Sequence, residues 1–382
     1  MTVDKPGDIE EFALKRFFND EPGRGATYNL SSSVCEPLTL DDLLALEDGA
    51  TRELGRLSLG YPGMHGSGPL RALIAERYDG LTADDILVMT GADDAIALLL
   101  LSCVAPGDHV VVHAPGYQPF AALARWHGCA VSPWYAREEA GWALDLDELI
   151  GLLTPRTRLI VVIIPHNPTG YAMPAREFAD LLRLAEGRGM TVVSDEIYAG
   201  IAADPAAELS PAAALSPRAV SIGGLSKSFG LPGLRIGWIA TADRALLDAA
   251  RRVRMHENSF ASAPSEYLAA IALRHSAGIL ARNRAIARDN LLAVAAFIDV
   301  HRDVLAWHAP RAGVLAFPRL REPQTADTFC AAVLACTGIL LAPSSLFAYG
   351  DRHIRIGFGL RNVPTVLAAL DRYLRALEDA TR

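Results

Sequence analysis

The strongest constraint on the fold is a regular alternation of short apolar strands and helices between about residues 85 and 195. The pattern predicts strands at 86–89, 110–112, 129–132, 159–164 and 191–193, with helices at 91–101, 117–126, 146–153 and 175–188. The run 159–164 is apolar at every position, so both of its faces must be buried. Such strands predict an α/β fold with a mainly parallel sheet and helices on both of its faces.

The two ends of the chain follow a different pattern. Helices are expected at 9–18, 40–46, 70–78, 244–253, 266–298 and 365–377, and strands at 219–222, 236–239, 314–318 and 353–358. A chain of 382 residues is long for a single core. We therefore expect a large domain of residues 51–275 and a smaller α+β domain built from residues 1–50 and 276–382.

Charge and cysteine content narrow the classes of partner. A net charge of −8 argues against nucleic acid and anionic membranes as partners. The longest apolar runs, 95–105 and 159–165, are too short to span a bilayer. The amino terminus is polar and has no apolar signal segment, and the five cysteines show no C-x-x-C spacing. These features predict a cytoplasmic protein with reduced thiols.

One lysine stands out because lysine is so rare in this chain. Lys5, Lys15 and Lys227 are its only lysines, against 33 arginines. Lys227 lies in a glycine-rich turn between the apolar runs 219–222 and 236–239, where a backbone can approach a ligand closely. Lysine can form a Schiff base with a carbonyl compound, whereas arginine cannot lose its proton. Lys227 is therefore a candidate nucleophile, with a solvated loop lysine as the alternative.

Polar residues follow several of the predicted strands. Asn167 comes after the strand 159–164 and either donates its amide to a ligand or belongs to an ordinary Asn-Pro turn. Asp195 comes after the strand 191–193, so its carboxylate is expected to be buried and to need a cationic partner. That partner is either an arginine or a protonated pyridine nitrogen. Gly91-Ala92-Asp93 opens a helix, where free N–H groups bind phosphate.

Two arginines are singled out by their positions. Arg235 lies eight residues after Lys227, and Arg355 lies in the apolar strand 353–358. An arginine within such a strand is costly unless its guanidinium forks onto an anion. Among 33 arginines, the alternative for either residue is a surface position or an ion pair.

Together these fragments resemble the fold-type I pyridoxal-phosphate enzymes of the aspartate aminotransferase (class I/II) family. The resemblance runs from Tyr61 to the end of the chain. Its motifs stand in the family's order: Tyr61, Gly66, Leu70-Arg71, Gly91-Ala92, Pro106-Gly107-Asp108, Pro115-Gly116-Tyr117, Asn167-Pro-Thr-Gly170, Asp195-Glu-Ile-Tyr198, Ser226-Lys227, Gly233-Leu-Arg235 and Arg355.

The resemblance implies pyridoxal 5′-phosphate as cofactor and assigns residues to its ring. Lys227 would hold the aldehyde as a Schiff base and later move a proton to and from the substrate. Asp195 would keep the pyridine nitrogen protonated. Asn167 and Tyr198 would hydrogen-bond the ring hydroxyl, and Tyr117 would stack on the ring.

The resemblance also assigns residues to the two anionic groups. Arg235 and the backbone at Ala92 and Asp93 would hold the phosphate, together with Tyr61 from a neighbouring subunit. Arg355 would clamp the α-carboxylate of the substrate, with Asn167 beside it. A site shared in this way implies a homodimer.

Three features depart from the family pattern. The family often has a phosphate-binding serine where this chain has Gly224, and Thr90 or Ser226 are candidates to compensate. The loop 29–33 replaces the common Gly-x-Pro substrate loop. No arginine for a side-chain carboxylate is evident, although Arg254 is a candidate.

The amino-terminal region bears a second resemblance, to enzymes of the capreomycidine synthase group. It rests on Ile9-Glu-Glu-Phe12, Arg16-Phe-Phe18, Leu30-Ser-Ser-Ser33 and the segment 310–319. Enzymes of that group eliminate and cyclise a hydroxylated arginine. Glu10 and Glu11 would then face a guanidinium, with His256 or Glu257 near the pocket. Alternatively, the two glutamates form the acidic first turn of a surface helix.

The sequence thus predicts a pyridoxal-phosphate enzyme that acts on the α-amino group of a free L-amino acid. Aminotransfer to a 2-oxo acid is the first hypothesis. Elimination, replacement or cyclisation at the side chain of a (hydroxy)arginine-type substrate is the alternative. A regulator that keeps the fold without catalysis is a third, disfavoured because the lysine, aspartate, tyrosine and arginine set is complete.

Overall fold

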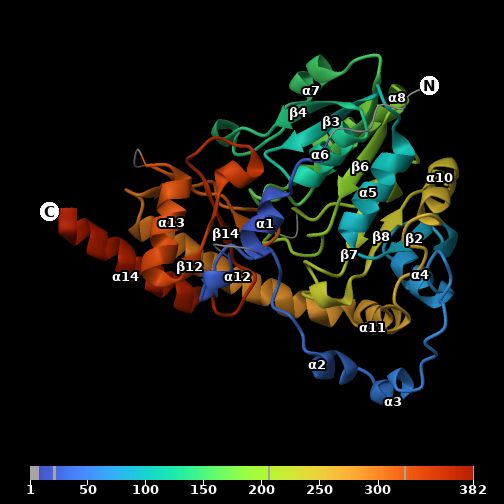
Figure 1. Cartoon of the computed structure of the whole chain (residues 1–382), viewed down its shortest axis with the longest axis horizontal. Helices are drawn as coiled ribbons and strands as arrows, with labels where there is room; N and C mark the ends of the chain where they lie inside the picture. Colours follow the sequence, from blue (N-terminus) through green and yellow to red (C-terminus); the bar gives the residue numbers. More distant parts are fainter. Residues whose placement is uncertain (1–7, 20–22, 205–206, 322–323, 382) are drawn as a thin grey trace.

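A seven-stranded sheet lies at the centre of the computed structural model, which describes residues 8–19, 23–204, 207–321 and 324–381 (Figure 1). Its strand order is β2-β8-β7-β6-β5-β3-β4, and every strand except β8 runs in the same direction. The strands are β2 (Ile86–Met89), β3 (His109–Ala114), β4 (Ala130–Tyr135), β5 (Thr157–Ile163), β6 (Thr191–Asp195), β7 (Ala219–Gly224) and β8 (Gly237–Ala240). The predicted α/β class with a mainly parallel sheet is confirmed.

Both faces of this sheet are buried, as the apolar strands predict. On β5, Leu159, Val161 and Ile163 belong to one core cluster, and Ile160 and Val162 belong to another on the opposite face. The first cluster also holds side chains of α5 (Ala92–Cys103), α6 (Gln118–Trp126) and α10 (Arg244–Arg254). The second holds side chains of α7 (Leu146–Leu152), α8 (Ala175–Gly187) and α9 (Ala212–Leu215).

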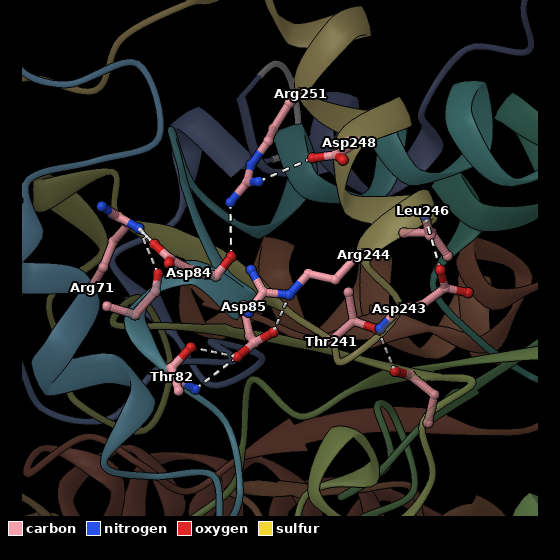
Figure 2. Close-up of polar contacts among 12 residues, drawn as sticks. Arg71, Thr82, Asp84, Asp85, Thr241, Asp243, Arg244, Leu246, Asp248 and Arg251 are labelled. Carbon is pink, nitrogen blue, oxygen red and sulfur yellow. Dashed lines mark hydrogen bonds and ion pairs between the residues drawn. The ribbon is translucent and has the colours of Figure 1, made fainter.

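The start of β2 is fastened to its neighbouring helices by charged side chains (Figure 2). Asp85 is buried, and it pairs with Arg244 (3.0 Å) and accepts a hydrogen bond from the Thr82 hydroxyl (2.7 Å). Arg251 of α10 donates to the carbonyl oxygen of Asp84 at 2.8 Å. These contacts hold the strand that leads directly into Gly91-Ala92-Asp93.

The two chain ends meet beside the large sheet. Strand β1 (Tyr28–Asn29) pairs in parallel with β12 (Ile339–Leu340), about 310 residues later in the chain. Two further small sheets are formed by β10 (Leu315–Ala316), β14 (Ile354–Gly357) and β13 (Ala342–Pro343), and by β9 (Leu305–Ala306) and β11 (Arg319–Leu320). Their helices are α12 (Ser276–Val300), α13 (Ala326–Thr337) and α14 (Val363–Thr381). The expected boundaries, 51–275 against 1–50 and 276–382, stay a prediction.

Short helices complete the described chain. Thr39 begins α2 (Leu40–Leu44) with a capping box. The others are α3 (Ala50–Leu54), α4 (Gly68–Ala75) and the 3₁₀ helices η1 (Gly23–Gly25), η2 (Ala83–Asp85), η3 (Glu138–Ala140), η5 (Pro232–Leu234) and η6 (Ser344–Phe347). Within the described residues, no helix has both the length and the apolar character needed to cross a bilayer.

Two expected helices differ from the observed ones. The helix expected at 9–18 is shorter, because α1 (Ala13–Asn19) begins only where Gln118 accepts a hydrogen bond from the Ala13 N–H (3.1 Å). The single helix expected at 266–298 is two helices, α11 (Ala263–Arg274) and α12. His275 interrupts it with φ −102° and ψ 19°, and its ring contacts Glu47 at 3.1 Å.

Candidate active site

Nine of the ten residues that the aminotransferase resemblance assigns to cofactor or substrate line one cavity of about 230 Å³. Most of them follow a strand of the large sheet at its carboxyl end, the edge where open α/β sheets bind ligands. These nine residues are Ala92, Asp93, Tyr117, Asn167, Asp195, Tyr198, Lys227, Arg235 and Arg355.

Five strands of the large sheet each place a candidate residue at the cavity, at or just after their carboxyl ends. Asp195 is the last residue of β6, and Lys227 follows β7 by three positions. Asn167 lies in the turn after β5. Asp93 lies in the first turn of α5 after β2, and Tyr117 is the N-cap residue of α6 after β3. Five strand ends thus converge on one cavity.

Lys227 has the surroundings of a reactive amine. Its Nζ donates a hydrogen bond to Ser33 Oγ at 2.9 Å. Burial, followed by the nearby positive charge of Arg355, lowers the pKa of Lys227 from 10.5 to about 8. At pH 7 this raises the neutral fraction of the amine about 300-fold. The alternative of a solvated loop lysine does not describe this residue.

Asp195 is a buried carboxylate with no arginine partner in the described part of the chain. Its Oδ1 accepts a hydrogen bond from the Ile197 N–H at 3.2 Å. Burial raises the pKa of Asp195 to about 7, and the nearby carboxylate of Asp93 adds to the rise. Among the described residues, no arginine perturbs the pKa of Asp195, so of the two alternatives the arginine partner is not found there. A protonated ring nitrogen would supply the missing cation.

Two neutral groups lie near this carboxylate in the cavity, Asn167 and Tyr198. Burial raises the pKa of Tyr198, so its phenol keeps its proton and remains able to donate. Asn167 Oδ1 accepts a hydrogen bond from Arg355 Nη1 at 3.1 Å, which leaves the Asn167 amide nitrogen able to donate to a ligand.

Arg355 is a fully buried arginine on β14 without a carboxylate partner in the described chain. Its Nη2 donates to the carbonyl oxygen of Ser31 at 2.8 Å, and its Nε has no hydrogen-bond partner among the residues that the structure describes. The guanidinium lies over the rings of Phe18 and Phe347, 5.6 Å and 5.2 Å from their centroids. A guanidinium held in this way is suited to a carboxylate ligand.

The helix α5 and Arg235 form a cradle for an anion. Gly91 precedes the helix with φ +99°, and a side chain at this position would overlap the guanidinium of Arg235. The first-turn N–H groups of α5 and the guanidinium therefore lie side by side. This donor set fits a phosphate group.

Gly224, the departure from the family serine, has a packing explanation. A Cβ atom here would lie 2.8 Å from Ile197 Cδ1 and 3.2 Å from the Ile236 carbonyl oxygen. Of the two residues considered as compensation, Ser226 lines the cavity. The Thr90 hydroxyl instead accepts a hydrogen bond from Asn258 at 2.6 Å.

Other candidates lie outside this cavity. Tyr61 is 88% exposed and stacks on Phe260 (centroids 4.7 Å apart). Glu10 pairs with Arg125 (3.2 Å) and borders a second cavity of about 270 Å³ instead. Arg254 is buried, with its guanidinium bonded to backbone carbonyl groups, so the structure does not bring it to the cavity as a carboxylate ligand. Glu11, His256 and Glu257 do not line the cavity either.

Sequence reasoning missed the contribution of the amino-terminal segment. Ser33 contacts Lys227, and Phe12, Lys15 and Phe18 line the cavity from in front of or within α1. The hydroxyl-rich loop 29–33 was a visible signal for Ser33. Nothing in the local sequence of α1 indicates which of its side chains face a ligand.

Comparison with known proteins identifies related sequences and folds. The sequence profile of the family "Aminotransferase class I and II" matches residues 28–370. Capreomycidine synthase of Streptomyces vinaceus is 33% identical over 352 residues, 92% of this chain and 88% of that protein. A crystal structure of a PLP-dependent aminotransferase from Streptococcus suis superposes with a TM-score of 0.91 at 28% identity, covering 97% of this chain and 98% of the other. The PLP-dependent cyclase OrfR superposes with a TM-score of 0.87 at 30% identity, covering 98% and 100%.

Proposed function

Because this chain belongs to the family of class I and II aminotransferases, we propose that it transfers the amino group of a free L-amino acid to a 2-oxo acid. Its cofactor is pyridoxal 5′-phosphate. The observation that carries the proposal is the presence of Lys227, Asp195 and Arg355 in a single cavity. An amine of lowered pKa, a buried carboxylate and a buried guanidinium without a carboxylate partner in the described chain are the three groups that this chemistry requires.

Lys227 does the proton chemistry. When bound, the cofactor supplies an aldehyde that condenses with amines and a ring that withdraws electrons from the substrate α-carbon. The neutral amine of Lys227 would be the residue that holds that aldehyde. With substrate bound, the same amine would be the base that takes the α-proton and the acid that returns it. Ser33 Oγ accepts a hydrogen bond from the amine and orients it.

Four residues would hold the cofactor ring. Asp195 would pair with the ring nitrogen and keep it protonated. Asn167 and Tyr198 would donate hydrogen bonds to the ring hydroxyl. Tyr117 would stack on the ring. This assignment accounts for the buried carboxylate of Asp195, which forms no ion pair with an arginine or lysine among the described residues.

The remaining polar groups would bind the two anionic ends. Arg235 and the N–H groups of Ala92 and Asp93 hold the phosphate at the start of α5. Arg355 forks onto the α-carboxylate of the substrate, held in place by Asn167 and the Ser31 carbonyl oxygen.

The enzyme would act as a homodimer with shared sites. Tyr61 is a highly exposed aromatic residue outside the cavity of its own protomer, and a second copy would receive its hydroxyl at the phosphate. Light scattering should report a dimer, and Tyr61→Phe should weaken cofactor binding. A monomeric holoenzyme with full activity would contradict this part of the proposal.

A cytoplasmic location fits the cysteines. All five are free thiols, and burial raises the pKa of Cys35 to about 12, which keeps that thiol protonated and unreactive. Cell fractionation tests the location directly, because an enzyme recovered only from an oxidising compartment would contradict it.

A second candidate function is cyclisation at the side chain of a (hydroxy)arginine-type substrate. It is favoured by the similarity to capreomycidine synthase and to the cyclase OrfR, which extends over nearly the whole chain. The same lysine, aspartate and arginine set serves both reactions, because both begin with removal of the α-proton.

An isotope experiment separates the two reactions. The holoenzyme is incubated with amino acids labelled with ¹⁵N at the α-amino group, including arginine and hydroxyarginines, and with an unlabelled 2-oxo acid. Aminotransfer moves the label into a new amino acid derived from the 2-oxo acid. Cyclisation keeps the label in a product derived from the substrate, without consuming 2-oxo acid, and that result would replace the first proposal by the second.

Borohydride trapping provides the control for the shared part of the mechanism. Reduction of the holoenzyme should leave one cofactor-bearing peptide, which contains Lys227. Lys227→Ala should abolish turnover and the trapped adduct while leaving the far-ultraviolet circular dichroism unchanged. An adduct at another lysine, or turnover by the variant, would refute the assignment of Lys227.

A further inference from the structure

The second lysine of the described chain also lies in the active-site cavity. Lys15, on α1, lines the cavity, and its Nζ forms an ion pair with Asp93 Oδ2 at 2.8 Å. The two residues are 78 positions apart, so this contact joins the amino-terminal helix to the first turn of α5. In a chain that uses arginine almost everywhere else, a lysine in this place calls for an explanation.

The same aspartate holds Tyr117. Asp93 Oδ1 accepts a hydrogen bond from the Tyr117 hydroxyl at 2.8 Å. Phe12 packs edge-on against the Tyr117 ring, with centroids 5.2 Å apart, and Lys15 Nζ lies 5.3 Å from the centroid of Phe12. The amino-terminal segment thus contacts Tyr117 in two ways, directly through Phe12 and indirectly through Lys15 and Asp93.

The negative charge of Asp93 lies beside the expected phosphate, and Lys15 compensates it. The Asp93 carboxylate lies in the first turn of α5, whose N–H groups would bind a phosphate dianion. The carboxylate and the phosphate would therefore be close enough to repel each other. Burial by itself would raise the pKa of Asp93, but the hydrogen bonds from Lys15 and Tyr117 bring the pKa below its ordinary value. The carboxylate is therefore ionised at neutral pH, and the Lys15 ammonium is the cation that pairs with it.

We infer that Lys15 is a positioning residue of the cofactor site, which neutralises Asp93 beside the phosphate and lets Asp93 orient the stacking ring of Tyr117. The inference rests on the proposed function, because it assumes that pyridoxal phosphate binds with its phosphate at α5 and its ring against Tyr117. It adds the amino-terminal helix to the cofactor site.

The test measures the affinity of cofactor-free protein for pyridoxal phosphate. Lys15→Met removes the charge and keeps the chain length, and because the ion pair is partly exposed it should weaken binding about three- to fivefold at low ionic strength. Lys15→Met combined with Asp93→Asn should return close to the wild-type affinity, since the asparagine oxygen still accepts from Tyr117 but carries no charge. Arg16→Met is the matched control. Arg16 neighbours Lys15 on α1 but pairs with Glu11 and does not line the cavity, so this variant should bind pyridoxal phosphate with wild-type affinity.

A second readout reports on the orientation of the ring. The visible circular dichroism of the bound cofactor depends on the asymmetric contacts of its ring, and Lys15→Met should change it at saturating cofactor. Lys15→Arg, which restores a cation, should return the wild-type signal. A residue that merely stabilises α1 would not change this signal once the site is saturated.

Two results would overturn the inference. One is a wild-type affinity and dichroism in Lys15→Met. The other is a double variant as weak as Lys15→Met alone, because Lys15 would then not act through Asp93. Both are distinct from a failure of the proposed function, in which the wild-type protein itself takes up no pyridoxal phosphate and gives no trapped adduct at Lys227.

Discussion

Replacing Lys227 by methionine should stabilise the cofactor-free protein at neutral pH. The folded chain lowers the pKa of this amine from 10.5 to about 8, mainly through burial and then through Arg355. Holding the protonated amine in the folded state therefore costs about 3 kcal/mol relative to the unfolded chain. Methionine removes this cost but also removes the hydrogen bond to Ser33, worth about 1 kcal/mol. The net gain in the free energy of unfolding is about 2 kcal/mol.

The gain should depend on pH in a defined direction. Below pH 8 the amine is protonated in both the folded and the unfolded state, so the full cost is present in the wild type. Between pH 8 and 10.5 the folded amine loses its proton while the unfolded amine keeps it, and the cost fades as the pH rises. The free energy of unfolding of Lys227→Met should thus exceed that of the wild type most at pH 7 and least near pH 10.

Urea unfolding of the cofactor-free proteins, followed by tryptophan fluorescence at several pH values, measures this difference. Ser33→Ala is the matched control, because it removes the hydrogen bond and keeps the amine, and it should lower stability by about 1 kcal/mol. The reasoning fails if Lys227→Met is less stable than the wild type at pH 7, or if its gain is the same at pH 7 and pH 10.

Three further predictions concern residues that would bind the cofactor or the substrate. Asp195→Asn should lower kcat by about 100-fold or more, because the ring nitrogen loses the carboxylate that keeps it protonated. A kcat close to that of the wild type in steady-state kinetics would contradict this role of Asp195. Arg355→Lys should raise KM for the amino acid at least tenfold with a smaller change in kcat, since an ammonium cannot fork onto a carboxylate, and an unchanged KM would contradict the clamp. Gly91→Ala should weaken cofactor affinity about tenfold or more, because its Cβ overlaps the Arg235 guanidinium and its φ of +99° disfavours a side chain; equilibrium binding at wild-type strength would refute the cradle.

The sheet could be predicted because its strands carry a strong physical signal. A strand that is apolar on both faces has no other stable environment than the middle of a layered sheet, and β5 lies within two residues of the predicted range 159–164. Asp195 and Asn167 could be placed because the carboxyl ends of parallel strands share one edge. The family resemblance added the roles of these residues, which spacing alone left open.

The remaining features depend on contacts between distant parts of the chain. Helix α13 was not predicted, although its residues are strongly apolar, because its sequence shows no clear amphipathic period. The late start of α1 is set by Gln118, more than one hundred residues away. The contact between Ser33 and Lys227 spans 194 residues, and no local pattern encodes such a pairing.

The meeting of the chain ends has a consequence for how the enzyme is made on the ribosome. The backbone N–H of Leu30 donates a hydrogen bond to the carbonyl oxygen of Leu340, and the carbonyl oxygen of Ser31 accepts one from Arg355. At roughly 5–20 residues per second, the amino-terminal loop remains without its partner strand for about 15 to 60 seconds of translation. Nascent chains arrested before residue 340 should therefore fail to retain the vitamin-derived coenzyme, so its capture marks a polypeptide whose synthesis is nearly complete.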